Sequence, residues 1–274
     1  MILVKAVVSP PSQSPNYLNT ESPVILTPIV SDAPAIPTAH IPFSERSALQ
    51  SLYSTTMGNY WTVYPDEIKW DFSSNLTNPC VEKWIGILCS IQNSSNTITL
   101  HIVSIDLSNR NLIGILPSDL VQLSWLRNLQ LNNNNLHGKI PMEVNKLTNL
   151  QSMDVSNNFL TGQIPMFGEM INLIHLNLAF NLLTSLTTRH NATTVSSFED
   201  LFSLEYLNIC NNPLEGSLGN FKYFIYLKSV YICNTNLAVT VPQFESSTKL
   251  QIISLYNNQF IGSIPQFSNL VNIV

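Results

Sequence analysis

The 274-residue sequence predicts an α/β repeat solenoid, and three observations support this fold class. A 13-residue pattern, L-x-L-x-x-N-x-L-x-G-x-I-P, recurs seven times from residue 105 onward. Successive copies start 24, 24, 23, 31, 23 and 23 residues apart. The segment before them combines a helical apolar spacing with a stretch rich in tryptophan and cysteine. A fixed period of this length is typical of stacked coils that bury apolar residues against their neighbours.

Residues 1–43 are expected to form an extended arm. They contain half of the 16 prolines, with serine and threonine between them: Pro10, Pro11, Pro15, Pro23, Pro28, Pro34, Pro37 and Pro42. Each proline fixes φ and removes a backbone donor, which disfavours a packed element. A Pro/Ser/Thr composition is also typical of stalks with O-linked glycans outside cells.

Residues 44–99 differ in composition and precede the repeats. Leu49, Leu52 and Tyr53 share one face of a helix expected within SERSALQSLYSTTM. Trp61, Trp70 and the segment CVEKWIGILC (80–89) follow.

Residues 100–274 hold the repeats. The copies cover 105–117, 129–141, 153–165, 176–188, 207–219, 230–242 and 253–265, and a truncated eighth begins at Leu270. We call the 13 positions of the pattern places one to thirteen. Apolar residues at places one and three predict a short strand with an inward apolar face. These inward residues, such as 107, 131 and 155, should line up as rungs of one ladder.

Two other places of the pattern suggest specific backbone roles. The asparagine at place six can bond the backbone of its own turn, so stacked copies would satisfy groups that a buried bend leaves open. Only one of the four asparagines in LQLNNNNLHGKIP (129–141), Asn134, is expected to be required; its neighbours should face solvent. The glycine at place ten permits a φ that other residues resist.

The repeats and the preceding segment resemble the plant-type leucine-rich repeat family. Cys80, Trp84, Gly86 and Cys89 match the Cys-x-x-x-Trp-x-Gly-x-x-Cys core of that family's N-terminal cap. The resemblance covers about 230 residues. It implies a curved, right-handed, extracellular superhelix with a parallel β-sheet on its concave face, as in receptor-like ectodomains. Such proteins usually bind peptides, glycans or proteins without catalysis. Arg110 and Thr235 depart from the asparagine, and Ser185 and Val239 from the glycine.

The four cysteines form two candidate pairs. The cap resemblance favours a disulfide between Cys80 and Cys89 over two buried thiols, which would imply an oxidising compartment. Cys210 and Cys233 occupy place four of adjacent repeats, and parallel strands lie about 4.8 Å apart, within disulfide reach. Their side chains point the same way, however, which leaves this pairing open. Zinc binding is disfavoured because no further ligands align.

Three N-glycosylation sequons begin at Asn75, Asn93 and Asn191, all outside the repeat pattern. Surface N-linked glycans are therefore expected on a secreted chain. Asn191 lies in an insertion near 186–200, where a spacing of 31 residues replaces 23 or 24. Such insertions become surface loops that either bind or only vary in length.

The concave face is the expected ligand surface. Small polar residues of the first repeats give way to aromatic ones, and tyrosine offers apolar area and a hydroxyl at low entropic cost. The same tyrosines could reflect strand propensity alone. The candidate contact residues are Tyr206, Tyr231, Tyr256, His175, Asn177, Asp154 and Gln130.

Other function classes are disfavoured. A net charge of −5 with 12 scattered basic residues argues against nucleic-acid binding. No apolar run is long enough to span a membrane. We expect no catalytic residues, metal or cofactor, because no catalytic motif occurs and Asp106 and Asp154 have no apolar pocket to make them an acid pair.

Two functions remain from the sequence. The first is a secreted or cell-surface recognition module with a protein, peptide or glycan ligand. The alternative is a structural glycoprotein subunit of a matrix or filament, which would self-associate through the Pro-rich arm and an uncapped repeat end.

Overall fold

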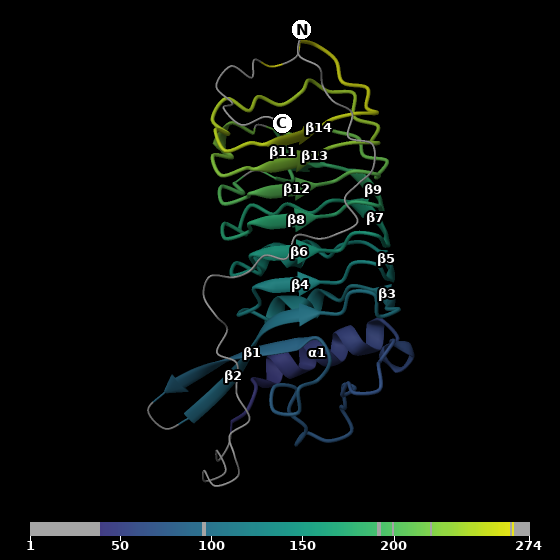
Figure 1. Cartoon of the computed structure of the whole chain (residues 1–274), viewed down its shortest axis with the longest axis vertical. Helices are drawn as coiled ribbons and strands as arrows, with labels where there is room; N and C mark the ends of the chain where they lie inside the picture. Colours follow the sequence, from purple (N-terminus) through teal and green to yellow (C-terminus); the bar gives the residue numbers. More distant parts are fainter. Residues whose placement is uncertain are drawn as a thin grey trace.

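The computed structural model describes residues 39–94, 97–190, 193–198, 200–219, 221–263 and 265. Most of the predicted arm, Asn191 and the eighth repeat lie outside this part of the chain. The described residues form one elongated stack of coils with a helix and a hairpin at one end (Figure 1).

The predicted helix is α1, Phe43–Thr55, which lies at the N-terminal end of the stack. Its buried face consists of Glu45, 2% exposed, and of Ala48, Leu49 and Leu52, each 0% exposed. Tyr53 is half-buried and meets Trp61 edge to face at 5.2 Å between ring centroids. A short 3-10 turn, η1 (Gly58–Tyr60), follows.

An eight-stranded sheet runs along one face of the stack in the order β1-β2-β4-β6-β8-β12-β13-β14. Its strands are β1 (Ile87–Ser94), β2 (Thr97–Asp106), β4 (Asn128–Gln130), β6 (Ser152–Asp154), β8 (His175–Asn177), β12 (Tyr206–Asn208), β13 (Ser229–Tyr231) and β14 (Ile252–Ser254). β1 and β2 form an antiparallel hairpin, and all later pairs are parallel.

The register of this sheet confirms the predicted ladder. The place-one residues Ile105, Leu129 and Met153 are direct partners, and the series continues through Ile253. At place three, the amide of each residue donates to the carbonyl of the next coil's strand, as from Leu107 to Gln130 at 2.9 Å. Each coil therefore buries its leucines between the coil before and the coil after it.

A second parallel sheet, β3-β5-β7-β9, lies on the side of the stack to which each coil continues after its strand of the first sheet. Its strands are β3 (Ile113–Ile115), β5 (Asn135–Gly138), β7 (Phe159–Gln163) and β9 (Leu182–Ser185). Short 3-10 turns, η2 (Ser118–Gln122), η3 (Met142–Lys146) and η4 (Phe221–Tyr223), close three coils. The only α-helix of the described residues is α1 in the cap, so strands and tight turns build the coils.

The predicted insertion forms a two-stranded hairpin. β10 (Thr187–His190) pairs antiparallel with β11 (Thr193–Ser196). Buried Ser197 ends the insertion by donating from Oγ to the carbonyl of Ile164 at 2.9 Å. After the insertion, the chain therefore continues directly as part of the same coil.

The predicted asparagine ladder is present inside the stack. The amide nitrogen of Asn158 donates to the carbonyls of Leu131 (3.0 Å) and Val155 (3.1 Å). Its amide oxygen accepts from the backbone N–H of Leu136 at 2.9 Å. The same arrangement recurs, wholly or in part, at Asn134, Asn181, Asn212 and Asn258.

The expectation that only one asparagine per turn matters needs correction. Place five adopts a left-handed backbone in all seven coils, with φ between 51° and 59°. Six of these residues are asparagine, which tolerates this conformation better than most side chains. They are Asn109, Asn133, Asn157, Asn211, Asn234 and Asn257, and Phe180 is the exception. Asn133 therefore also has a structural role, although it faces solvent as expected.

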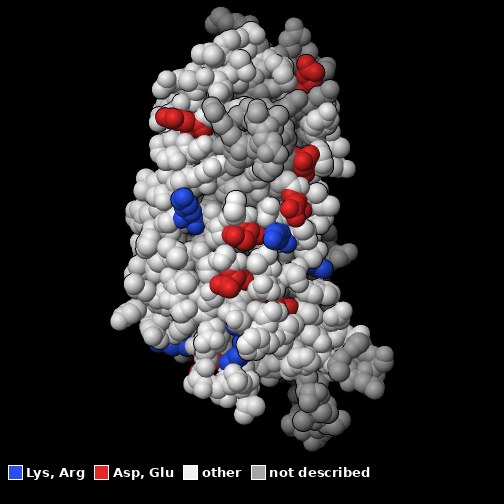
Figure 2. Space-filling model, turned by 180° about the vertical axis from the view of Figure 1, so that it is seen from behind, with Lys and Arg blue, Asp and Glu red and all other residues white. Residues whose placement is uncertain are grey.

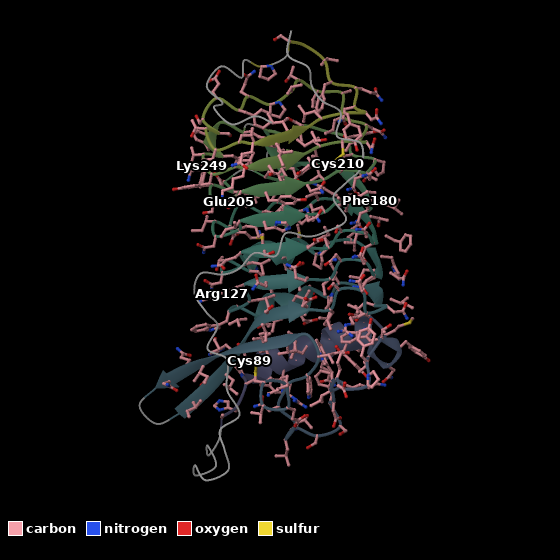
Figure 3. The ribbon with its side chains drawn as sticks, viewed as in Figure 1. Cys89, Arg127, Phe180, Glu205, Cys210 and Lys249 are labelled. Carbon is pink, nitrogen blue, oxygen red and sulfur yellow. A yellow bond between two sulfur atoms is a disulfide. The ribbon has the colours of Figure 1, made fainter. Side chains whose placement is uncertain are left out.

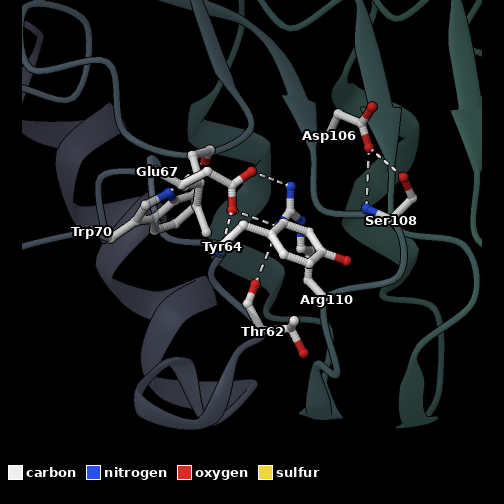
Figure 4. A network of polar contacts seen from close by, with 8 residues as sticks. Thr62, Tyr64, Glu67, Trp70, Asp106, Ser108 and Arg110 are labelled. Atoms are coloured by element: carbon white, nitrogen blue, oxygen red, sulfur yellow. Dashed lines mark hydrogen bonds and ion pairs between the residues drawn. The ribbon is translucent and has the colours of Figure 1, made fainter.

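Arg110 takes the place of the ladder asparagine where the first coil meets the cap (Figure 4). Its guanidinium forms two contacts with the Glu67 carboxylate, at 2.7 Å and 2.5 Å, and lies 4.8 Å from the Tyr64 ring. The hydrogen bond from Arg110 lowers the pKa of Glu67. This departure from the pattern thus joins the cap to the repeats.

Candidate recognition surface on the strand face

The outward side chains of the eight-stranded sheet form three columns, which we call the strand face. They occupy the place before the first strand leucine and places two and four of each repeat. Among the described residues of these columns, the only aspartate, glutamate, histidine, lysine or arginine side chains are those of Asp106, Asp154 and His175. The strand face therefore has no lysine or arginine among the described residues, in contrast to its edges, where Arg127 and Lys249 lie (Figure 3).

The N-terminal half of the strand face is a polar network. Asp106 accepts from the Ser108 hydroxyl at 2.6 Å, and Gln130 donates to the Ser152 hydroxyl at 2.9 Å. These four side chains belong to the first three coils and remain partly or fully exposed, whereas Ser104 and Ser156 are buried, at 8% and 4%. Gln130 therefore lies where a ligand could reach it, and its contact with a ligand stays a prediction.

Asp154 is placed differently from the other predicted contact residues. It is 3% exposed, and its carboxylate accepts from the hydroxyl of Ser156 (2.6 Å) and the amide of Asn177 (2.9 Å). Neighbouring side chains therefore take up its acceptor capacity, so we assign Asp154 to holding the network rather than to direct contact. Asn177 is half-buried and links this carboxylate to the next coil.

The C-terminal half of the strand face holds an aromatic cluster of His175, Tyr206 and Tyr231. The His175 and Tyr206 rings are stacked, with 4.2 Å between centroids and 12° between planes. The Tyr206 and Tyr231 rings lie 5.6 Å apart at 47°. Tyr256 is 39% exposed and lies in another column. The three predicted tyrosines thus form a diagonal across three columns, because they occupy different places of the repeat.

The Cys210–Cys233 disulfide lies beside this cluster. The two Cα atoms are 4.5 Å apart on consecutive coils, so the pairing that the sequence left open is made. Both cysteines are at most 5% exposed and pack with Ala179 and Tyr231 in a small apolar cluster. This cluster occupies place four, where the earlier coils have serines and an asparagine, and it packs against Tyr231.

Burial lowers the pKa of His175, and the negative charge of Asp154 acts in the opposite direction. The ring is therefore mainly neutral near neutral pH and stacks as an aromatic group on Tyr206. A neutral imidazole, three tyrosine hydroxyls and several amides give the strand face both hydrogen-bond donors and acceptors.

Features outside the strand face also bear on the sequence predictions. Cys80 and Cys89 form the predicted disulfide. Asn75 and Asn93 are exposed, whereas Asn191 lies outside the described residues. In the same part of the chain, no cluster of three metal-ligating side chains occurs, and no helix is long and apolar enough to cross a membrane. The face seen in Figure 2 carries scattered charges of both signs rather than a basic patch.

The family model for the Leucine Rich Repeat matches residues 125–147, 149–169 and 203–223. These matches cover three of the seven coils described above, those of β4, β6 and β12. These three coils are therefore similar to the Leucine Rich Repeat family. The repeats that the family model does not match include those in which Ser185 and Val239 replace the usual glycine.

The proteins similar to this chain include receptor-like kinases. The chain is 35% identical over 85 residues to the probable leucine-rich repeat receptor-like protein kinase At5g49770 of Arabidopsis thaliana, covering 30% of this chain and 8% of that protein. The structure of PEPR1-AtPEP1 matches with a TM-score of 0.65 and 25% identity, over 84% of this chain and 30% of that one. A Pollen Receptor Kinase 3 structure matches with a TM-score of 0.58 and 25% identity, over 79% and 96%. The chain therefore spans a small part of the first two relatives.

Proposed function

We propose that this leucine-rich repeat domain is a non-catalytic recognition module that binds an extended peptide or protein segment on its strand face. The observation that supports this best is the aromatic cluster of His175, Tyr206 and Tyr231 beside a polar network on one continuous sheet. The similarity to receptor-like kinases and to PEPR1-AtPEP1 supports the same class of function.

A peptide fits this surface better than a glycan. Sugars pack their C–H groups on exposed faces of aromatic rings, but Tyr206 lies between His175 and Tyr231 in the stack. The cluster therefore offers ring edges and hydroxyl groups, which suit the amides and side chains of a peptide. Asn208 is part of this arrangement because its amide donates to the Tyr206 hydroxyl at 3.2 Å.

The charge of the strand face suggests the charge of its ligand. Asp106 is exposed, and no basic residue lies among the described residues of the three columns. A neutral or basic peptide is therefore favoured over an acidic one, because a like charge opposite Asp106 would be unfavourable. Its basic end would lie over the first coils and its apolar part over the aromatic cluster.

The test is selection of a phage-displayed random peptide library on the purified chain. The expected peptides bind at least about thirtyfold more weakly to the variant Tyr206→Ser/Tyr231→Ser, since two aromatic contacts of more than about 1 kcal/mol each are lost. Met142→Ser, a change at a residue that is 72% exposed away from the strand face, serves as the matched control. Equal binding to all three proteins, or binding of an immobilised glycan array instead, would contradict the proposal.

The setting we propose for this module is the cell exterior. Two disulfides favour an oxidising compartment, and exposed Asn75 and Asn93 suit N-linked glycans. Intact-mass analysis of protein from a secreting eukaryotic host, before and after enzymatic removal of N-glycans, checks both sites with Asn75→Gln and Asn93→Gln. An unchanged mass would argue against glycosylation, including at Asn191.

The second candidate is a self-associating structural subunit. The composition of residues 1–43 favours it, because Pro-rich arms can bridge neighbouring molecules. Light scattering after size-exclusion chromatography separates the two: a monomer supports recognition, and concentration-dependent assemblies support the structural role.

A further inference from the structure

Five exposed apolar side chains lie on the side of the stack from which each coil enters its strand of the eight-stranded sheet. We call them the flank patch: Ile171, Phe202, Tyr223, Ile225 and Tyr226, with 54%, 43%, 57%, 47% and 42% of their surface exposed. They lie outside the strand face and outside the core. Isolated exposed apolar residues are common, but a contiguous group of this size marks an interaction surface.

The repeat pattern aligns the patch along the axis of the stack. Ile171, Phe202 and Ile225 each lie five residues before the first inward residue of β8, β12 or β13. Other coils have small polar residues at this place, namely Ser124, Thr148 and Thr248. The fold therefore tolerates polar side chains here, and the apolar ones in three consecutive coils are not required for stacking.

The aromatic members of the patch contact one another and a basic residue. Phe202 and Tyr223 lie 6.2 Å apart, edge to face. The Lys249 ammonium is 4.6 Å from the Tyr226 ring. Figure 3 shows Arg127, Glu205 and Lys249 along this same edge, and Glu205 is paired with Lys228 at 2.6 Å. Exposed Glu169 and Asp200 lie seven residues before the inward residue of their strands, as Tyr223 does, so the flank carries charges of both signs.

We propose that the flank patch binds a proline-rich extended chain, and that the segment 10–28 of this same protein is its ligand. Pro-rich chains are recognised by exposed aromatic side chains because their polyproline II conformation is preformed and loses little entropy on binding. The flank patch supplies three aromatic and two aliphatic side chains for this purpose.

The dimensions of the patch fit such a chain running along the axis of the stack. A polyproline II helix advances about 9.3 Å per turn of three residues. Two steps between parallel strands span about 9.6 Å. Ile171 and Ile225 are two coils apart, so residues one turn apart in the ligand would meet equivalent places on the patch.

The length and charge of the N-terminal segment support it as the occupant. Ala39, the first described residue, is held beside the cap, where its carbonyl accepts from the Asn78 amide at 3.1 Å. The coils of the patch are three to five strand positions beyond β2, about 14 to 24 Å along the stack. Ten residues of polyproline II chain reach about 31 Å. The proposed ligand, residues 10–28, contains one acidic residue, Glu21, and no lysine or arginine, and its acidic side chain suits the Lys249 ammonium beside Tyr226.

The first experiment places a photo-cross-linking phenylalanine analogue at Tyr226 in the full chain and identifies the cross-linked peptides by mass spectrometry. The expected products join position 226 to peptides within residues 10–28, and they disappear in the double variant Phe202→Thr/Ile225→Thr. Threonine is chosen because Thr148 and Thr248 occupy this place in other coils. Cross-links within one chain indicate an internal contact, and cross-linked dimers indicate an arm exchanged between copies; both support the proposal.

The second experiment measures binding of a fluorescent peptide with the sequence of residues 8–30 to the full chain by anisotropy. The double threonine variant and a peptide with Pro15, Pro23 and Pro28 replaced by alanine should each bind about tenfold more weakly. Phe159→Thr, at a residue 53% exposed on the opposite flank, is the control and should bind normally. Affinity unchanged by both sets of substitutions, or cross-links only to residues outside 10–28, would overturn the proposal.

Discussion

At the scale of single residues, asparagine does two separate jobs in each turn. At place six it is buried and satisfies backbone groups of its own coil and the preceding coil, as Asn134 does through bonds to Leu107 and Leu131. At place five it adopts the left-handed conformation at the surface. Both jobs depend on a short amide side chain, which explains why asparagine is so frequent in a chain with few charged residues.

Asn158→Ala should reduce the free energy of unfolding by about 2 kcal/mol, because it leaves the amide of Leu136 buried without a partner and removes one of the two hydrogen bonds to the carbonyl of Leu131. Urea unfolding followed by circular dichroism measures this loss. Asn135→Ala is the matched control, since Asn135 is exposed and should change stability by less than about 0.5 kcal/mol. Equal effects of the two substitutions would mean that the buried ladder adds no stability.

His175 should make stability depend on pH. Its pKa is below the ordinary value of 6.5 because of burial, so the unfolded chain binds a proton more readily than the folded one. Stability is therefore complete above about pH 6.5 and declines as the pH falls toward the lowered pKa. His175→Gln should show a smaller loss between about pH 7 and pH 5 than the parent protein. His137→Gln, at an exposed histidine, should retain the parent's loss; if it does not, His175 is not the group responsible.

The sequence was sufficient to predict which strand residues of the site point into the core, but not how its surface side chains are arranged. A period of two along each strand placed Leu129 inward and Gln130 outward, as the structure has them. The sequence could not reveal that Asp154 is buried, because this depends on contact with the next coil, from which the Asn177 amide donates to its carboxylate. The fifth-place asparagines were a signal that could have been used, since six of seven copies share them.

At the scale of elements, the joint between cap and repeats depends on close backbone contact. Gly114, in β3, has φ 137°, and a Cβ atom there would lie 1.9 Å from the carbonyl oxygen of Thr55 at the end of α1. The amide of Ile113 donates to the carbonyl of Thr56 at 3.1 Å, next to this contact. The glycine of the first repeat is therefore needed for docking of the helix as well as for its conformation.

Gly114→Ala should destabilise the chain by more than Gly262→Ala. At Gly262 a Cβ atom would meet only the methyl group of Thr240, at 3.2 Å, so backbone strain of about 1 kcal/mol is the main cost. At Gly114 the helix must also move, so we expect about 3 kcal/mol or more. Differential scanning calorimetry compares the two variants. A similar decrease in Tm for both would show that α1 does not depend on this contact.

The repeat pattern predicted the first sheet but not the second. Leucines at places one and three define the strands of the first sheet directly. In contrast, β5 (Asn135–Gly138) comes from L-x-G, a pattern that fits a turn as well as a strand. Its pairing with β3 becomes favourable only when the coils stack, since the partners Gly114 and Leu136 are far apart in sequence. Such pairs arise from tertiary contact and leave no local pattern.

At the scale of the whole molecule, stability passes from coil to coil. Contacts within the stack join each coil to its two neighbours, so the stability of the array is approximately a sum over coils and the interfaces between them. The Cys210–Cys233 bond is a covalent link across one of these interfaces. It ties β12 to β13, near the C-terminal end of the described coils.

Cys210→Ala/Cys233→Ala should lower stability by about 3 kcal/mol, the value expected for a closed loop of this length. Because the array is nearly one-dimensional, we expect the coils after β12 to unfold before the rest. Urea unfolding monitored by hydrogen exchange of individual peptides would show two transitions in the variant where the parent shows one. The double variant Cys80→Ala/Cys89→Ala should instead destabilise the cap. If both double variants destabilised all coils equally, the effect of each disulfide would not be local.

The direction of the asparagine bonds has a consequence for how the protein is made. Each ladder asparagine donates to a carbonyl of the preceding coil: Asn134 to Leu107, Asn158 to Leu131, and Asn181 to Val155. Each turn thus waits for a side chain synthesised some two dozen residues later. As the ribosome extends the polypeptide, the coils should therefore become ordered one at a time from the amino end. Each coil becomes ordered when the asparagine of the next coil has emerged and bonds to it.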